Sequence, residues 1–119
     1  MTERSRIEFF FEDNIANGIN IQTSAPIPLG EIWQIQRVIF ADMSLNDTKS
    51  GVYKVDFGVD GDRAIIGAAY LTGATQVLDY SLALVGDGLK VFRFIRESQS
   101  SPAKRMMILM TGFKRIGDI

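Results

Sequence analysis

Residues 27–43, IPLGEIWQIQRVIFADM, form the longest apolar-rich run of the chain and contain its only tryptophan. As a strand, the run has one face with Trp33, Ile35, Ile39, Ala41 and Met43, interrupted by Arg37, and a second with Ile32, Val38 and Phe40. As a helix, it places Ile32, Ile35, Ile39 and Met43 at spacings of three and four. Ile, Val, Trp and Phe suit a pleated surface, and good helix formers are scarce here, so composition favours the strand.

The overall composition is that of one ordinary globular domain spanning residues 1–119. A chain of 119 residues and 13.2 kDa is long enough to bury roughly two-thirds of its unfolded surface. Hydrophobic residues make up 46% and charged residues 23%, which argues against disorder. No apolar run approaches the roughly 20 residues that cross a bilayer, so we expect no membrane span. The opening MTERSRIEFFFED also lacks the features of a secretory signal.

Two residue types are missing altogether, and their absence excludes several kinds of chemistry. Without cysteine the chain has no disulfide, no thiolate metal site and no thiol nucleophile. Without histidine it lacks the commonest general base near neutral pH and the commonest zinc ligand. The remaining acidic and basic residues show no spacing typical of acid–base catalysis. We therefore expect a protein that is not an enzyme and that holds no cofactor.

Seven further segments have the pattern of strands. Apolar and polar residues alternate at 5–11, 19–23, 51–60, 75–85, 89–96 and 105–116. The small apolar segment 64–71 fits either a buried strand or a short helix. The clearest alternation is at 51–60, where the core-facing residues are expected to be Tyr53, Val55, Phe57 and Val59. In residues 75–85 the inward residues are expected to be Leu78, Tyr80, Leu82 and Leu84.

Turn residues separate these segments at roughly ten-residue spacing. They are Glu12-Asp13-Asn14, Asn17-Gly18, Asp60-Gly61-Asp62 and Gly86-Asp87-Gly88. The last of them predicts a hairpin between residues 75–85 and 89–96. Eight or nine short strands joined in this way predict an all-β, antiparallel β-sandwich that is jelly-roll-like.

Two clusters invite a ligand interpretation. Asp56, Asp60 and Asp62 offer three carboxylates to calcium, but they lack the spacing of a calcium loop, and glycine between aspartates is ordinary turn chemistry. The glycines that follow Phe57 have no Gly-Lys-Ser/Thr sequence and no strand-to-helix context, which argues against a phosphate loop. We predict no metal site and no nucleotide site.

The charges are divided along the chain. Residues 1–89 hold 6 basic and 12 acidic residues, whereas residues 90–119 hold 7 and 2. The basic residues of the second part are Lys90, Arg93, Arg96, Lys104, Arg105, Lys114 and Arg115. Basic residues interleaved with Phe92, Phe94 and Phe113 are typical of proteins that bind single-stranded nucleic acid. The same pattern arises when the phenylalanines lie in the core and the basic residues lie on solvent-exposed strand faces and edges, where they prevent pairing with other strands. A pI near 5.3 favours the second interpretation. A surface with charges of both signs suits a protein that faces a partner.

Four segments resemble those of the small jelly-roll accessory proteins of tailed bacteriophages. They are the Pro-Gly approach to an aromatic strand, IPLGEIWQIQRVIFAD, the Gly-bounded strand GVYKVDFGVDG, the hairpin YSLALVGDGLKVFRFI and the closing ILMTGFKRI. Together they cover most of the chain from Pro26 onward. The resemblance implies a non-enzymatic component of the virion: a capsid decoration or cement protein, often trimeric, bound to the major capsid protein. The alternative it implies is a tail, collar or baseplate component.

Three consecutive phenylalanines indicate a contact surface. Phe9, Phe10 and Phe11 put aromatic rings on both faces of the first strand, and one of these faces has to meet something other than the core of its own domain. We add Arg93, Arg96 and Arg105 as contact residues because they are expected at strand faces and edges. The rival function is a carbohydrate-binding sandwich, in which the stacking platform would be Trp33, Tyr53, Tyr70 or Tyr80.

Overall fold

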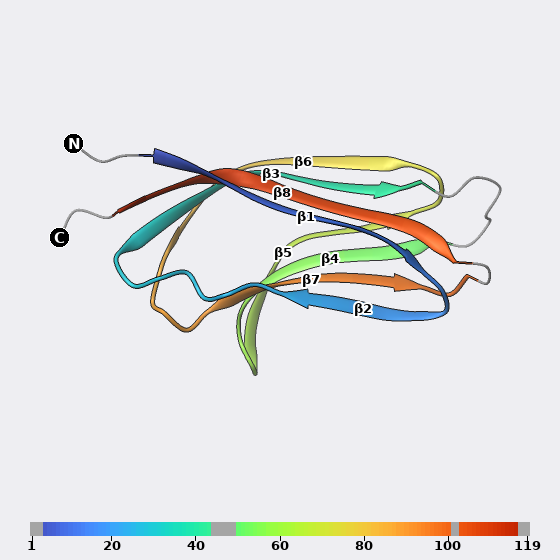
Figure 1. Ribbon diagram of the computed structural model, residues 1–119, viewed down its shortest axis with the longest axis horizontal. Coiled ribbons are helices and arrows are strands. Elements are labelled where there is room, and N and C mark those ends of the chain that lie inside the picture. The colour runs from blue at the N-terminus through green and yellow to red at the C-terminus, as the bar shows by residue number, and fades with distance from the viewer. Residues whose placement is uncertain (1–3, 44–49, 101–102, 117–119) are drawn as a thin grey trace.

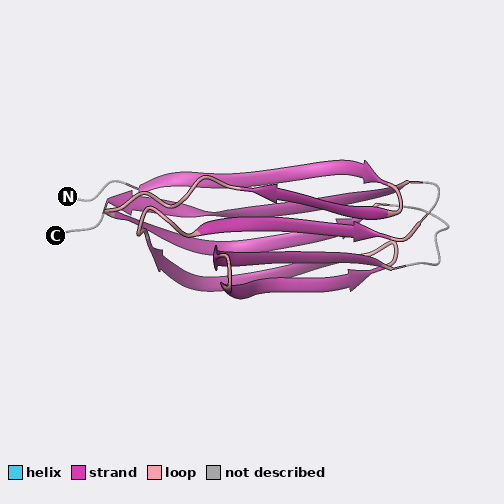
Figure 2. Cartoon of the chain, turned by 90° about the horizontal axis from the view of Figure 1, so that it is seen from below, coloured by secondary structure: helices cyan, strands magenta, loops and turns pink. Residues whose placement is uncertain are grey.

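The computed structural model describes residues 4–43, 50–100 and 103–116, which contain eight strands and no helix (Figure 1). The strands are β1 (Arg4–Ile15), β2 (Gly18–Thr23), β3 (Glu31–Asp42), β4 (Gly51–Val59), β5 (Asp62–Leu71), β6 (Thr75–Val85), β7 (Val91–Ser98) and β8 (Lys104–Ile116). Most of them run along the long axis of the molecule (Figure 2). The predicted all-β class is confirmed, and the ambiguous segment 64–71 lies in a strand.

Two antiparallel four-stranded sheets face each other, with the strand orders β1-β8-β3-β6 and β2-β7-β4-β5. Every connection except the one between β4 and β5 carries the chain from one sheet to the other. This is the strand order of a jelly roll, in which eight strands form two facing sheets. The predicted antiparallel sandwich is therefore confirmed (Figure 1).

The central stretch of the sequence forms β3, an inner strand between β8 and β6. A β-bulge between Ile35 and Arg37 shifts its register against both neighbours. Trp33 and Ile35 face the core before the bulge, and Val38 and Phe40 face it afterwards. Our assignment of Val38 and Phe40 to the opposite face from Trp33 was wrong, because one extra residue reverses a period of two.

Glycine on the neighbouring strand makes room for this bulge. Gly112 of β8 pairs with Ile35, and a Cβ at Gly112 would lie 2.1 Å from the carbonyl oxygen of Gln34. The bulge keeps Arg37 on the outer face, where its Nε lies 2.7 Å from Asp79 of β6. Without the shift, strict alternation would send the arginine toward the core together with Trp33 and Ile35.

Two predicted turns are corrected by the structure. Glu12-Asp13-Asn14 belongs to β1, which pairs with β8 as far as Ile15, and the reversal comes afterwards at Asn17, whose φ is 45°. Gly86-Asp87-Gly88 joins strands of different sheets and is not a hairpin. Its Gly86 and Gly88 amides donate to Glu31 and Ile27, so this turn is anchored on the segment that leads into β3.

The core lies between the sheets and is rich in aromatic rings. Phe92 stacks on Trp33, with ring centroids 6.0 Å apart, and lies 4.6 Å from the ring of Phe57. The predicted core residues Tyr53, Val55 and Phe57 are buried, and Val59 is half-buried. The inward residues of β6 pack against this core as predicted; they are Leu78, Tyr80, Leu82 and Leu84.

Tyr53 gives this core a pH dependence. Its hydroxyl donates to the Ala41 carbonyl over 3.1 Å, and burial, helped by the charge of Asp42, raises its pKa well above the ordinary value of 10.0. The folded protein therefore keeps this proton after the unfolded chain has lost it. Stability that is present below pH 10 should fall as the pH rises above about 10.

Tyr53→Phe should remove this alkaline component. We expect the variant to lose about 1 kcal/mol at pH 8, because the hydrogen bond to Ala41 is gone. Between pH 8 and pH 11 its free energy of unfolding should fall less than that of the wild type, as measured by urea denaturation at both pH values. An equal fall in the free energy of unfolding between pH 8 and pH 11 in the two proteins would contradict the role given to Tyr53.

Candidate interaction surface

An apolar row crosses the outer face of the β1-β8-β3-β6 sheet. Strand register aligns Phe10 of β1 with Leu109 of β8, Leu109 with Ile39 of β3, and Ile39 with Val77 of β6. We call these four residues the Phe10 row. Phe10 is 51% exposed and Val77 is 44% exposed, while the two inner members are half-buried. Met107 and Ala41 extend the apolar surface into the next position of β8 and β3.

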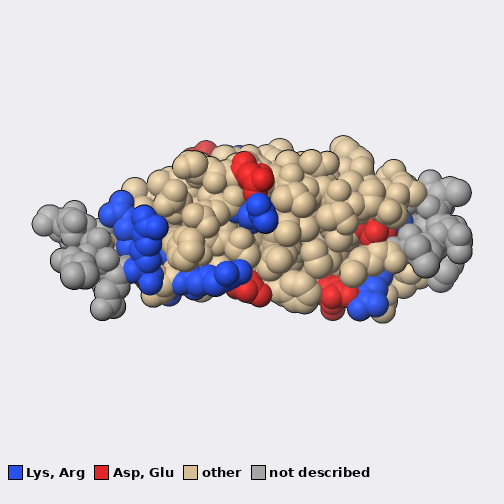
Figure 3. Space-filling view, turned by 90° about the horizontal axis from the view of Figure 1, so that it is seen from above, with Lys and Arg blue, Asp and Glu red and all other residues tan. Residues whose placement is uncertain are grey.

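Ion pairs lie on both sides of the row. Arg37 and Asp79 pair on one side, and Glu12 and Arg105 pair on the other. The space-filling view shows that uncharged residues cover most of this face (Figure 3). An apolar centre with a polar rim is the usual anatomy of a protein–protein contact, so this face is the candidate site.

The structure places the predicted contact residues in different environments. Phe10 belongs to the row and Arg105 to its rim. Phe9 and Phe11 point inward, and their rings lie 5.2 Å and 5.0 Å from the ring of Phe94. Arg93 lies on the outer face of the other sheet.

Arg96 is corrected: it is wholly buried and offers no surface to a partner. Its position in β7 faces the core, on the same side as Phe92 and Phe94. The guanidinium donates to the Met106 carbonyl at 3.0 Å, to Asp13 at 2.8 Å and to Asn20 at 2.9 Å. It thereby links β7 to β8, β1 and β2, which satisfies a charge that would otherwise be costly to bury.

Two of the three aspartates considered for calcium, Asp56 and Asp60, are paired with arginines. Asp56 is almost wholly buried and receives two hydrogen bonds from Arg93, at 2.9 Å and 2.6 Å. This interaction raises the pKa of the Arg93 guanidinium. Arg63 lies 3.5 Å from Asp56 and 3.2 Å from the exposed Asp60. The described residues contain no group of three acidic side chains that could hold a metal ion.

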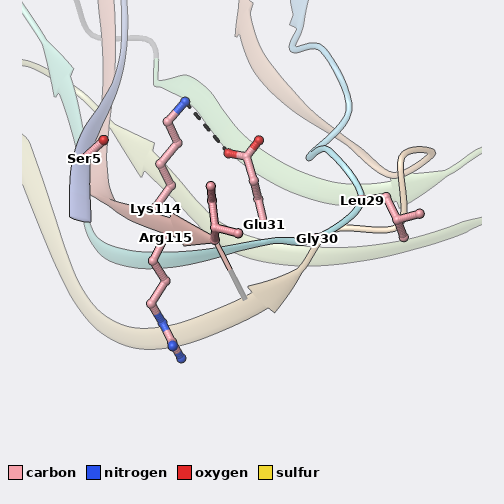
Figure 4. A pocket seen from close by; sticks show the side chains of 7 residues that line it. Ser5, Leu29, Gly30, Glu31, Lys114 and Arg115 are labelled. Carbon is pink, nitrogen blue, oxygen red and sulfur yellow. Dashed lines mark ion pairs between the residues drawn. The ribbon is translucent and has the colours of Figure 1, made fainter. Parts of the chain in front are cut away.

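A hollow of about 590 Å³ opens where β1 begins, β3 begins and β8 ends (Figure 4). Its charged side chains do not converge on one point. Lys114 faces Glu31, 3.8 Å away, whereas Arg115 points in another direction. Glu31 also accepts a hydrogen bond from the Trp33 indole nitrogen. The carboxylate is thus shared within the chain, and the hollow does not form a focused anion site.

The aromatic residues of the rival carbohydrate site are mostly inside the sandwich. Trp33 is 7% exposed and Tyr53 is wholly buried. Tyr80 uses its hydroxyl to donate to the Ile66 carbonyl over 2.5 Å, and burial raises its pKa. Tyr70 is the exposed member of the four, at 76%. A stacking platform built on Trp33 is therefore not available.

Comparison with known proteins gives structural neighbours only. No family model and no curated protein matches the chain. A chain in the structure of infectious bursal disease virus Gx strain aligns over 97% of this chain and 31% of its own length, with a TM-score of 0.46 and 9% identity. The Gt strain gives 97% and 32%, a TM-score of 0.45 and 10% identity.

Both neighbours are viral, and neither is a tailed-phage accessory protein. The chain spans about a third of the length of each. In the described part of the chain, no helix is long and apolar enough to cross a membrane.

Proposed function

We propose that this protein is a non-enzymatic structural component of a virus particle, and that it contacts other virion proteins through the Phe10 row. The observation that carries the proposal is an apolar row with a charged rim on the outer face of a jelly-roll sheet. Jelly rolls recur in viral capsid proteins, and this analogy of fold supports the proposal.

The finer proposal is a capsid decoration or cement protein of a bacteriophage, bound to the major capsid protein. Many copies on a repeating lattice would each bury a modest apolar area, and copies that are linked as an oligomer would bind with avidity. A tail, collar or baseplate component would use the same face against a different partner. The number of copies per particle separates the two.

Copy number is measured by quantitative mass spectrometry of particles purified from the source, scaled to the major capsid protein. Hundreds of copies would support decoration of the head lattice. A handful would assign the protein to the neck, tail or baseplate. Its absence from purified particles would overturn the virion proposal.

Phe10→Ser tests the face itself. We expect binding to particles to weaken at least tenfold, because a large aromatic side chain that becomes buried in a contact is a typical hot spot. The free energy of unfolding should change by less than about 1 kcal/mol, since the ring points away from the core. Binding is measured by co-sedimentation with particles and stability by urea denaturation.

Leu89→Ser is the matched control. Leu89 is an exposed apolar residue in the β6–β7 connection, outside the Phe10 row. Its replacement should leave particle binding at the wild-type level. Equal binding by the Phe10 variant and the control would show that the row is not the contact surface.

A further inference from the structure

The outer face of the second sheet, β2-β7-β4-β5, is also largely apolar. Its exposed large side chains are Ile19, Ile21, Ile65 and Tyr70. Ile95 and Val52 lie between them on the inner strands, and register places Ile95 beside Ile21. Together these residues line a groove of about 480 Å³. We call this surface the isoleucine face.

Two opposite charges stand on the isoleucine face. Lys54 of β4 pairs in register with Ile95 of β7, and Glu97 of β7 pairs with Val52 of β4. Lys54 and Glu97 are therefore diagonal neighbours on adjacent strands, two residues apart along the strand direction. Within residues 4–43, 50–100 and 103–116, neither side chain forms an ion pair. By contrast, Arg93 on the same face is neutralised by Asp56.

We propose that the isoleucine face packs against the same face of a second copy of this chain. A two-fold contact is self-complementary, so each element of the surface meets its complement twice. A two-fold axis that lies between the two sheets, perpendicular to the strands and midway between the two charged positions, would bring Lys54 beside the partner's Glu97 and Glu97 beside the partner's Lys54. The members of each pair would stand about one strand spacing apart along the interface, which two long side chains can span. The surrounding isoleucines would then be buried between two aligned sheets, as in sandwich packing.

The charges favour a second copy over an unrelated partner. A surface with one unpaired cation and one unpaired anion is complementary to itself after a two-fold rotation, and the charges of both copies are satisfied. Four strands and about nine residues give a face of roughly 19 by 30 Å. Because the isoleucine and tyrosine side chains stand out from the sheet, the accessible area exceeds this projection and approaches the roughly 800 Å² per partner of a standard interface.

This contact is separate from the proposed virion contact. The Phe10 row belongs to the other sheet, on the opposite side of the sandwich (Figure 1). Self-association through the isoleucine face would hold even if the protein were shown to bind no virion protein.

Charge reversal tests the pairing. The wild type should sediment as a dimer in analytical ultracentrifugation at about 0.1 mM. Lys54→Glu places two acidic residues together at each end of the contact, and Glu97→Lys places two basic residues there. The dissociation constant of the dimer should be at least tenfold higher for each single variant than for the wild type, because like charges in an interface strongly disfavour association. Lys90→Glu, in the β6–β7 connection, is the matched control and should leave the dimer unchanged.

Mixing the two single variants tests whether the charges pair across a two-fold contact. A mixture of the Lys54→Glu and Glu97→Lys proteins should form heterodimers, because both charge pairs are then opposite again, and the double variant should form homodimers. A monomeric wild type would overturn the proposal, as would single variants that still associate like the wild type. Failure of both the mixture and the double variant to associate would also overturn it. Circular dichroism of each variant is the control for folding, and we expect the wild-type spectrum from all of them.

Discussion

Lys104→Met is expected to lower the free energy of unfolding by about 3–5 kcal/mol, the largest single effect that we predict. The ammonium group lies 2.6 Å from Asp42 Oδ2, and both side chains are 0% exposed. Methionine replaces most of the volume of the lysine stem but leaves the carboxylate buried without its cation. The loss is measured by guanidinium denaturation, monitored through the fluorescence of Trp33.

The double variant Lys104→Met/Asp42→Asn separates lost charge pairing from lost packing. In the wild type, the Gly73 amide donates a hydrogen bond to Asp42 Oδ2 over 3.1 Å. Asparagine removes the charge of Asp42 but keeps a side-chain oxygen that can accept this hydrogen bond. We expect this pair to recover most of the stability lost in the single variant, because replacement of both ions is often close to neutral. A single variant within 1 kcal/mol of the wild type would contradict the importance of this ion pair.

Arg96→Met is expected to cost about 2–3 kcal/mol. Its guanidinium makes charge-assisted hydrogen bonds to Asp13 and Asn20 and donates to the Met106 carbonyl. The variant leaves that buried carbonyl without this donor, but Asp13 is half-exposed and recovers its hydration. The expected cost is therefore smaller than for Lys104.

Arg105→Met is the matched control for Arg96. Its side chain is 58% exposed and pairs with Glu12 on the outer face, so its loss should cost less than about 1 kcal/mol. The two variants make the same chemical change in the core, at Arg96 of β7, and on the outer face of the sandwich, at Arg105 of β8. Similar losses in both would contradict the assignment of Arg96 to the core. Urea denaturation of the three proteins under one set of conditions gives the comparison.

Much of the fold follows from alternation along single strands. Segment 51–60 alternates cleanly, and Tyr53, Val55 and Phe57 are buried as predicted. The same pattern in β6 correctly placed its leucines and Tyr80 against the core. These predictions succeed because a strand with one buried face must repeat every two residues.

The candidate site was predictable only in part. Three successive phenylalanines indicate that one ring lies outside, and Phe10 does. The other members of the row are Leu109, Ile39 and Val77, which come from three distant segments. Strand order and register bring them together, and neither is encoded in any one segment. The same holds for Lys54 and Glu97 on the isoleucine face.

The sequence by itself determined the strand content of this protein, its antiparallel sandwich and the residue types available for chemistry, because these depend on local period and composition. Tertiary structure decided that Gly86-Asp87-Gly88 crosses between sheets, that a bulge reverses the faces of β3 and that Arg96 is buried among its acceptors. The physical reason is that turn residues favour a reversal without choosing its partner strand. A charged side chain is likewise tolerated inside only where distant residues supply the hydrogen bonds that replace water.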